Sequence, residues 1–220
     1  MRSKSMFLAA LLVVATAGSA LAQQPGTRGI EITPLFGYRW GGGMSTIPGI
    51  RDFNTQDNIS YGVALLRRLP RNSAVDINWT HFSGDISATT TQAFPGSPPI
   101  GTHLSGPTLK RDDILMNGYW YAFDPSRPMI PYFTLGIGAS IFGTDKTSTI
   151  GRFAWTIGAG LRRELSDKLA LSVQGLWLPT WVTTGSGLWC DPWYCYSVGT
   201  GEYYDQFELT GGLILRLGGR

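Results

Sequence analysis

Residues 204–217 read Tyr-Asp-Gln-Phe-Glu-Leu-Thr-Gly-Gly-Leu-Ile-Leu-Arg-Leu and carry two chemically opposite faces. The odd-numbered positions include Phe207, Leu209, Leu213, Leu215 and Leu217, and the even-numbered positions include Gln206, Glu208, Thr210 and Arg216. Because successive side chains of a β-strand point to opposite sides of the sheet, this stretch predicts a strand that separates an apolar surface from a polar one. The rest of the chain decides whether the apolar surface faces a protein core or lipid.

Seven further segments show the same alternation. They lie at about 30–40, 59–65, 74–81, 113–123, 132–142, 153–162 and 169–177. In the fourth segment the pattern predicts Ile114, Met116 and Trp120 on the apolar face and Asp113 and Asn117 on the polar one. The aromatic residues Tyr119, Tyr121 and Phe123 share the face of Asp113 and Asn117 and favour the opposite assignment. The chain is therefore predicted to be all-β, with eight antiparallel strands.

The connections between these segments differ regularly in length. They are long after the first, third and seventh segments, moderate after the fifth, at about 143–150, and short after the second, fourth and sixth. The connection at 83–108 is rich in Ser, Thr, Gly and Pro and is expected to be a long loop; a hairpin within it is the alternative, which gives ten strands. This rhythm is typical of a bacterial up-and-down barrel with long outer loops and tight inner turns.

The residue composition of the polar face indicates that this face lies inside the barrel. The face consists mostly of Gly, Ser, Thr, Asn and Gln, with a few charges of both signs that can pair within an enclosed lumen. A soluble lipocalin-like barrel or sandwich would instead expose many Lys and Glu side chains. Aromatic residues near the strand ends suit the interfacial girdles of a membrane barrel; they include Tyr38, Trp40, Trp79, Trp120, Trp155, Trp177 and Tyr204.

The first residues predict export from the cytoplasm. Arg2 and Lys4 precede an apolar run at 6–17 and the small-residue site Ala20-Leu21-Ala22, so residues 1–22 are expected to be a cleaved secretory signal peptide and 23–220 a barrel domain in the outer membrane. Removing Arg2 and Lys4 from the 18 basic residues leaves 16 against 15 acidic ones. This near-neutral balance argues against a nucleic-acid partner.

The strands Ile30–Trp40, Tyr132–Ile141 and Phe207–Leu217, together with the signal peptide, resemble the small outer-membrane β-barrel family of OmpA-like, OmpX-like and OmpW-like proteins. The resemblance implies an eight-stranded antiparallel up-and-down transmembrane β-barrel whose partners are the outer-membrane bilayer and its assembly machinery. Members of this family commonly end on an aromatic residue, usually Phe, that is recognised during assembly. Here Leu217 stands near that position, and Gly218-Gly219-Arg220 follows it.

The lumen carries the first candidate site. An eight-stranded barrel has an interior just wide enough for side chains to fill. The candidate charge network comprises Glu31, Arg39, Arg162, Glu208 and Arg216. Because the first and last strands must pair to close a barrel, Glu31 and Arg216 are expected near one seam. These features predict a filled polar lumen and a structural or surface-binding role; the alternative is a narrow channel for small solutes or small hydrophobic molecules.

A second candidate site is enzymatic. His81 and Ser83 share one strand face in Thr80-His81-Phe82-Ser83-Gly84-Asp85, where His81 could activate Ser83 for acyl transfer. The spacing is similar to the His-x-Ser of outer-membrane lipid A deacylases, whose catalytic face looks toward lipid, but its place in the third strand departs from that family's order. Asp85 is the nearest acidic candidate. The chain is expected not to be an enzyme, with an acyl hydrolase at the outer rim as the alternative.

The last long loop carries the third candidate site. Cys190 and Cys195 are the two cysteines of the chain and are expected to form a disulfide that staples this loop. Nearby Trp189, Trp193 and Tyr194 are candidates for binding a surface ligand. Because no histidine or further cysteine lies close in sequence, no metal site is predicted there, and no cofactor is expected.

Overall fold

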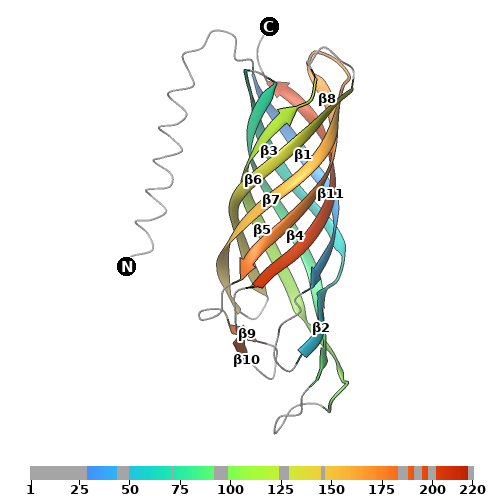
Figure 1. Ribbon diagram of the computed structural model, residues 1–220, viewed down its shortest axis with the longest axis vertical. Helices are drawn as coiled ribbons and strands as arrows, with labels where there is room; N and C mark the ends of the chain where they lie inside the picture. The colour runs from blue at the N-terminus through green and yellow to red at the C-terminus, as the bar shows by residue number, and fades with distance from the viewer. Residues whose placement is uncertain are drawn as a thin grey trace, which may run out of the picture.

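The computed structural model describes residues 29–43, 50–70, 72–91, 99–123, 129–144, 147–182, 188–190, 195–197 and 202–217. These segments form a cylinder of steeply tilted strands (Figure 1). In chain order the strands are β1 (Ile30–Gly43), β2 (Ile50–Thr55), β3 (Asn58–Leu69), β4 (Ser73–Thr90), β5 (His103–Tyr121), β6 (Met129–Thr144), β7 (Thr147–Glu164), β8 (Leu169–Val182), β9 (Leu188–Cys190), β10 (Cys195–Ser197) and β11 (Glu202–Leu217).

Pairing between the first and last strands closes the barrel. Antiparallel ladders connect β1, β3, β4, β5, β6, β7, β8 and β11 in this order, and β11 pairs back onto β1 with Glu31 opposite Arg216. The eight-stranded antiparallel barrel is thus confirmed, and the ten-stranded alternative is wrong. We call the end that carries β2, β9 and β10 the loop end; it lies at the bottom of Figure 1, opposite the turn end.

Apolar side chains cover the outside of the cylinder, and polar ones line its interior. Phe36, Leu135 and Leu209 are exposed, whereas Arg39 and Asp113 are completely buried. The predicted parity of the fourth barrel strand, β5, is confirmed, because Ile114, Met116 and Trp120 are exposed and Asp113 and Asn117 are buried. Such a surface would be unstable in water but is what a hydrocarbon environment requires.

The described segments contain no helix that is long and apolar enough to cross a bilayer.

The structure corrects two predicted connections. Most of the loop expected at 83–108 is strand, because β4 continues to Thr90, β5 begins at His103, and β2 pairs with the extended part of β4. Serine and threonine conceal this continuation in the sequence, but threonine is a good strand former. The moderate connection expected at 143–150 is also wrong, since β6 reaches Thr144 and β7 starts at Thr147.

One predicted girdle residue lies inside the barrel. Tyr204 is 1% exposed and donates or accepts a hydrogen bond with the Thr55 hydroxyl at 2.7 Å, so it fills the lumen and does not contact lipid. Its parity agrees with Gln206 and Glu208, which are buried too. The aromatic character of Tyr204 was therefore a weaker guide than its place in the alternation.

Two lumen glycines allow close contact between neighbouring strands. A Cβ atom on Gly62 would lie 2.1 Å from the Trp79 carbonyl oxygen, and one on Gly138 would lie 2.1 Å from the Ile114 carbonyl oxygen. These distances leave no room for any side chain. At both positions glycine permits the backbones of the two strands to approach closely.

Candidate functional sites

The first site is the loop-end cluster, defined as Arg39, Arg111, Asp113 and Glu208. Arg39 binds one carboxylate from the adjacent strand β11 and one from the more distant strand β5, since its Nη2 lies 2.9 Å from Glu208 Oε2 and its Nη1 lies 2.7 Å from Asp113 Oδ2. Arg111 Nε lies 2.7 Å from the other oxygen of Asp113. All four side chains are at most 1% exposed. Two arginines thus neutralise two carboxylates in a site without bulk water.

Neutral polar groups complete the loop-end cluster. The Ser60 hydroxyl donates to Glu208, and the Ser140 hydroxyl donates to Asp113. Arg111 donates from Nη1 to Gln206 Oε1 at 2.9 Å. Because buried charges need hydrogen bonds as well as a counter-charge, these groups lower the free-energy cost of the cluster.

Apolar side chains pack beside this cluster. They are Phe53, Ala88, Leu109, Phe142, Val182 and Tyr204, which form one contiguous buried group. The Arg111 guanidinium lies over the Phe142 ring, 5.2 Å from its centroid. Since Phe53 comes from β2, the extra strand outside the barrel ladder helps to fill the loop end. The group and the charged cluster together occupy the lumen at this level.

The second site is the turn-end cluster, defined as Glu31, Arg68, Arg162, Glu164 and Arg216. Glu31 is its centre, because it accepts from both Nη atoms of Arg162 at 2.7 and 2.8 Å and from Nε of Arg68 and of Arg216, each at 3.1 Å. Glu164 contacts the same three arginines. Arg68, Glu164 and Arg216 are 21%, 18% and 24% exposed, so water reaches the outer part of this cluster.

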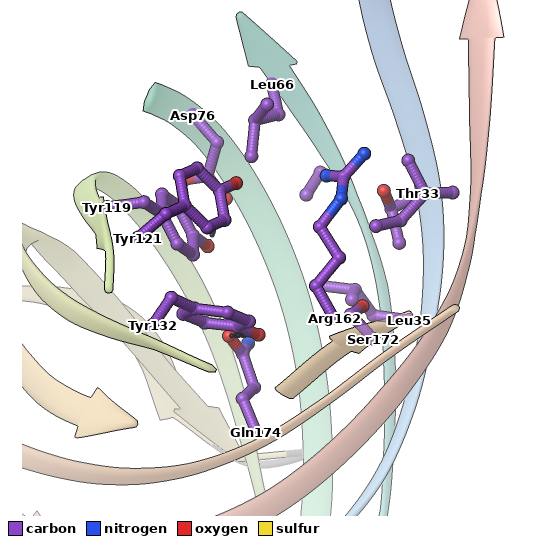
Figure 2. Close-up of a pocket in the computed structure, with 12 residues that line it drawn as sticks. Thr33, Leu35, Leu66, Asp76, Tyr119, Tyr121, Tyr132, Arg162, Ser172 and Gln174 are labelled. Carbon is purple, nitrogen blue, oxygen red and sulfur yellow. Dashed lines mark hydrogen bonds between the residues drawn. The ribbon is translucent and has the colours of Figure 1, made fainter. Parts of the chain in front are cut away.

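Between the two clusters lies a small cavity of about 30 Å³. Figure 2 shows Tyr119, Tyr121 and Tyr132 together on one side of this cavity, with Arg162 and Thr33 on the other. Asp76 accepts from the Tyr119 hydroxyl at 2.6 Å and from Asn117 Nδ2 at 2.8 Å. The volume suits a water molecule or two and is far below the ~300 Å³ of a small-molecule pocket.

The structure places the five lumen residues expected from the sequence in two clusters. Glu31, Arg162 and Arg216 meet at the turn end, whereas Arg39 and Glu208 lie in the loop-end cluster. Four members were not predicted from the sequence, namely Arg68, Arg111, Asp113 as a partner of Arg39, and Glu164. Arg68 and Glu164 lie on the inward faces of β3 and β7. Both come after the residues at which these strands were predicted to end, about 65 and 162.

The third site is on the outer wall, where β4 and β5 pair. His81 Nδ1 lies 2.8 Å from Asp112 Oδ1, and Trp79 Nε1 donates to the same oxygen at 3.1 Å. The Tyr61 ring lies 5.2 Å from the His81 ring, centroid to centroid. Asp112 was not predicted as a partner of His81, because it lies on the neighbouring strand, 31 residues away in sequence.

Ser83 lies two residues beyond His81 on the same outward face and opposite Lys110 in the ladder. Asp85, the acidic candidate from the sequence, accepts instead from the Thr108 hydroxyl at 2.6 Å. His81 is therefore paired with a carboxylate, as the histidine of a Ser–His–acid triad is, but this carboxylate is Asp112 and not Asp85.

The loop with the cysteines is described only in part. The backbones of β9 and β10 pair so that Cys190 stands opposite Cys195. The side chains of Trp189 and of both cysteines, and residues 191–194 with Trp193 and Tyr194, lie outside the described part. The disulfide and the aromatic binding loop stay predictions.

Comparisons with known proteins give a likeness in fold. No family model matches the sequence, and no curated protein matches it. Neisserial surface protein A has a similar structure, with a TM-score of 0.56 and 12% identity over 88% of this chain and 100% of that one. The outer membrane protease OmpT from Escherichia coli matches with a TM-score of 0.49 and 10% identity over 88% and 98% of the two chains.

The N-terminal β-barrel domain of Pseudomonas aeruginosa OprF is a further match, with a TM-score of 0.43 and 12% identity over 86% of this chain and 99% of that one. At these identities the likeness concerns the fold. The chain therefore has the fold of the small outer-membrane β-barrels.

Proposed function

Given this fold, we propose that the chain is an integral outer-membrane β-barrel of a Gram-negative-type cell envelope, with a structural or surface-binding role and a lumen that does not conduct. The observation that carries the proposal is the filled lumen. Two charge clusters, three tyrosines and the apolar group at the loop end occupy successive levels of the interior. A pore would need a continuous water-filled path instead.

The height of the apolar exterior supports insertion into a bilayer. On β1 the outward face is apolar from Ile30 to Trp40, and the ten steps between these residues, at roughly 3.3 Å each, extend about 33 Å along the strand. A tilt of ~40° reduces this to about 25 Å, the height of the apolar band in outer-membrane barrels. Tyr38, Trp40 and Phe207 stack at the loop-end edge of the band, as interfacial aromatic residues do.

Conductance tests the closed lumen. Purified, refolded protein in a planar bilayer is expected to give no discrete current steps at moderate voltage, because an ion would have to pass the turn-end cluster, the desolvated loop-end cluster and the apolar group beside it. A heat-modifiable shift in gel mobility on the same sample shows that the barrel is folded. Discrete steps from folded protein would instead support the narrow channel for small solutes or small hydrophobic molecules.

A second candidate function, an acyl hydrolase at the outer rim, is favoured by the bond between His81 and Asp112. A carboxylate on Nδ1 orients the imidazole and leaves Nε2 to accept the proton of a nucleophile. In this candidate function Ser83 Oγ attacks the acyl carbonyl of a lipid ester, the alcohol leaves with the proton from His81, and water then releases the fatty acid from the serine. Tyr61 and Trp79, whose rings contact each other, lie beside this site. Because Tyr and Trp favour the membrane interface, the site is expected at the depth of the lipid ester bonds.

Lipid acyl patterns test this candidate function. Vesicles of outer-membrane lipid incubated with the refolded protein should lose ester-linked chains, and His81→Ala and Ser83→Ala should each slow the loss at least 100-fold. His103→Ala, a change at the exposed second histidine, is the matched control and should have no effect. Identical acyl patterns for the wild type and His81→Ala would rule out hydrolysis at this site.

A further inference from the structure

A polar hollow opens on the outer wall at the loop end, outside the three sites described so far. Its volume is about 630 Å³, within the ~300–1,000 Å³ of ligand pockets. The polar lining residues are Asn54, Gln56, Asp57, Asp85, Ser87 and Ser105, which come from the end of β2, the segment that follows it, β4 and β5. The hollow exists because β4 and β5 continue beyond the barrel wall and β2 pairs with that extension.

Hydrogen bonds within the chain hold the walls of this hollow in place. Gln56 N donates to the Asp85 carbonyl oxygen at 2.8 Å and so fixes the segment after β2 to β4. Gly41 N donates to Asp57 Oδ1 at 3.3 Å, and Thr108 Oγ1 donates to Asp85 Oδ1 at 2.6 Å. Each carboxylate has about four lone-pair sites, so these bonds orient both groups and leave them able to accept more.

The position of the hollow follows from the proposed function, on which this inference rests. Along the outward face of β4, Trp79, His81, Ser83 and Asp85 succeed one another toward the loop end. On β4 the apolar residues of the outward face end at Trp79. In the proposed orientation Asp85 therefore lies beyond the hydrocarbon, at the boundary between head groups and water. The hollow would thus open to the outside of the cell.

The chemistry of the lining indicates the class of ligand. Two carboxylates, two amides and two hydroxyls offer many acceptors and several donors within one concave surface, which is the complement of a ring carrying several hydroxyl groups. The half-exposed Tyr38 ring adds an apolar face for the C–H side of such a ring. Among the described lining residues none is Lys, Arg or His, so no cation would offset the repulsion between the two carboxylates and a phosphate or sulfate group.

We propose that this hollow is a binding site for neutral sugars, in which Asp57 and Asp85 accept hydrogen bonds from sugar hydroxyls and Tyr38 packs against the ring. The same chemistry is available from a free oligosaccharide and from the sugar head group of a glycolipid in the surrounding leaflet. A membrane-borne sugar would enter from the side of Tyr38, which lies at the interface, whereas a free one would enter from solution.

Titration of the full-length refolded protein in nanodiscs tests the site. The probes are maltotriose, cellotriose and triacetylchitotriose, with a sulfated trisaccharide for comparison, and binding is followed by saturation-transfer NMR. At least one neutral probe should bind, and the double change Asp57→Asn/Asp85→Asn should weaken it at least tenfold, because an amide offers one acceptor atom in place of two. Asp167→Asn, an exposed change at the turn end, should leave binding unchanged.

The outcomes separate this inference from the proposed function. Absence of binding to every neutral probe, undiminished binding in the double variant, or preference for the sulfated probe would overturn the sugar site while a heat-modifiable, membrane-inserted barrel still stands. A protein that fails to insert would overturn the proposed function instead. Nanodiscs containing digalactosyl diacylglycerol distinguish the two sources: weaker binding of the free sugars in these discs would assign the site to a glycolipid head group, and unchanged binding to a free sugar.

Discussion

Replacing Arg39 with methionine is expected to lower the free energy of unfolding by about 3–5 kcal/mol. The guanidinium is completely buried and holds Asp113 and Glu208 at 2.7 and 2.9 Å. Without it, Asp113 keeps Arg111, but Glu208 keeps only the Ser60 hydroxyl among its described side-chain partners. A buried carboxylate that loses its counter-charge pays the desolvation cost without compensation.

Guanidinium titration of the protein in lipid vesicles, followed by the fluorescence of its 8 tryptophans, measures this loss. Arg152→Met, a change at a half-buried arginine of β7, is the matched control and should cost less than about 1 kcal/mol. The double variant Arg39→Met/Glu208→Met should recover most of the lost stability, because it removes both charges. If the double variant were less stable than Arg39→Met alone, the account of an unpaired Glu208 would be wrong.

Replacing Glu31 with glutamine is expected to have an effect of similar size at the other end of the lumen, about 3–5 kcal/mol. Glu31 is 2% exposed and accepts from Arg68, Arg162 and Arg216. Glutamine has the same shape but would leave three arginines with the single carboxylate of Glu164. Arg162 is 1% exposed and has no access to bulk water, so the loss of its carboxylate partner accounts for most of the lost stability.

Glu164→Gln provides the comparison, since it removes a carboxylate that contacts the same three arginines but is 18% exposed. Its cost should be clearly smaller, because water solvates the arginines on that side. Both free energies come from the vesicle titration, repeated at 0.1 and 1 M salt. Salt should reduce the effect of Glu164→Gln more than that of Glu31→Gln. Equal costs at both salt concentrations would show that burial does not govern this cluster.

Alternation along the chain was enough to predict the barrel and the orientation of its faces. Glu208 and Arg216 share a parity that could face water or a lumen, and the apolar outward faces of all eight barrel strands place them inside. The ends of the strands were harder to predict. β4 and β5 extend beyond the hydrocarbon, where Ser and Thr replace the apolar residues whose alternation marks a strand.

The composition of the clusters could be predicted only in part. The alternation indicates that Arg39 and Asp113 point inward, but nothing in the sequence tells which inward residues lie at the same height along the barrel axis. Arg39 and Asp113 are 74 residues apart, and their contact depends on the register of four strands and on the tilt they share. His81 and Asp112 illustrate the same limit on the outer wall, since only the β4–β5 register places them opposite each other.

The pairing of β1 with β11 has a consequence for the order of folding. Each charge cluster contains one residue from the first barrel strand and one from the last, with Arg39 and Glu208 169 residues apart and Glu31 and Arg216 185 apart. Neither arginine–carboxylate set is complete until the carboxyl-terminal strand has docked. Contacts of such long range form late and slowly. An open, partly assembled sheet therefore lacks the ion pairs that could stabilise it as an intermediate. Closure of the cylinder and neutralisation of its interior are therefore expected to occur in one cooperative step.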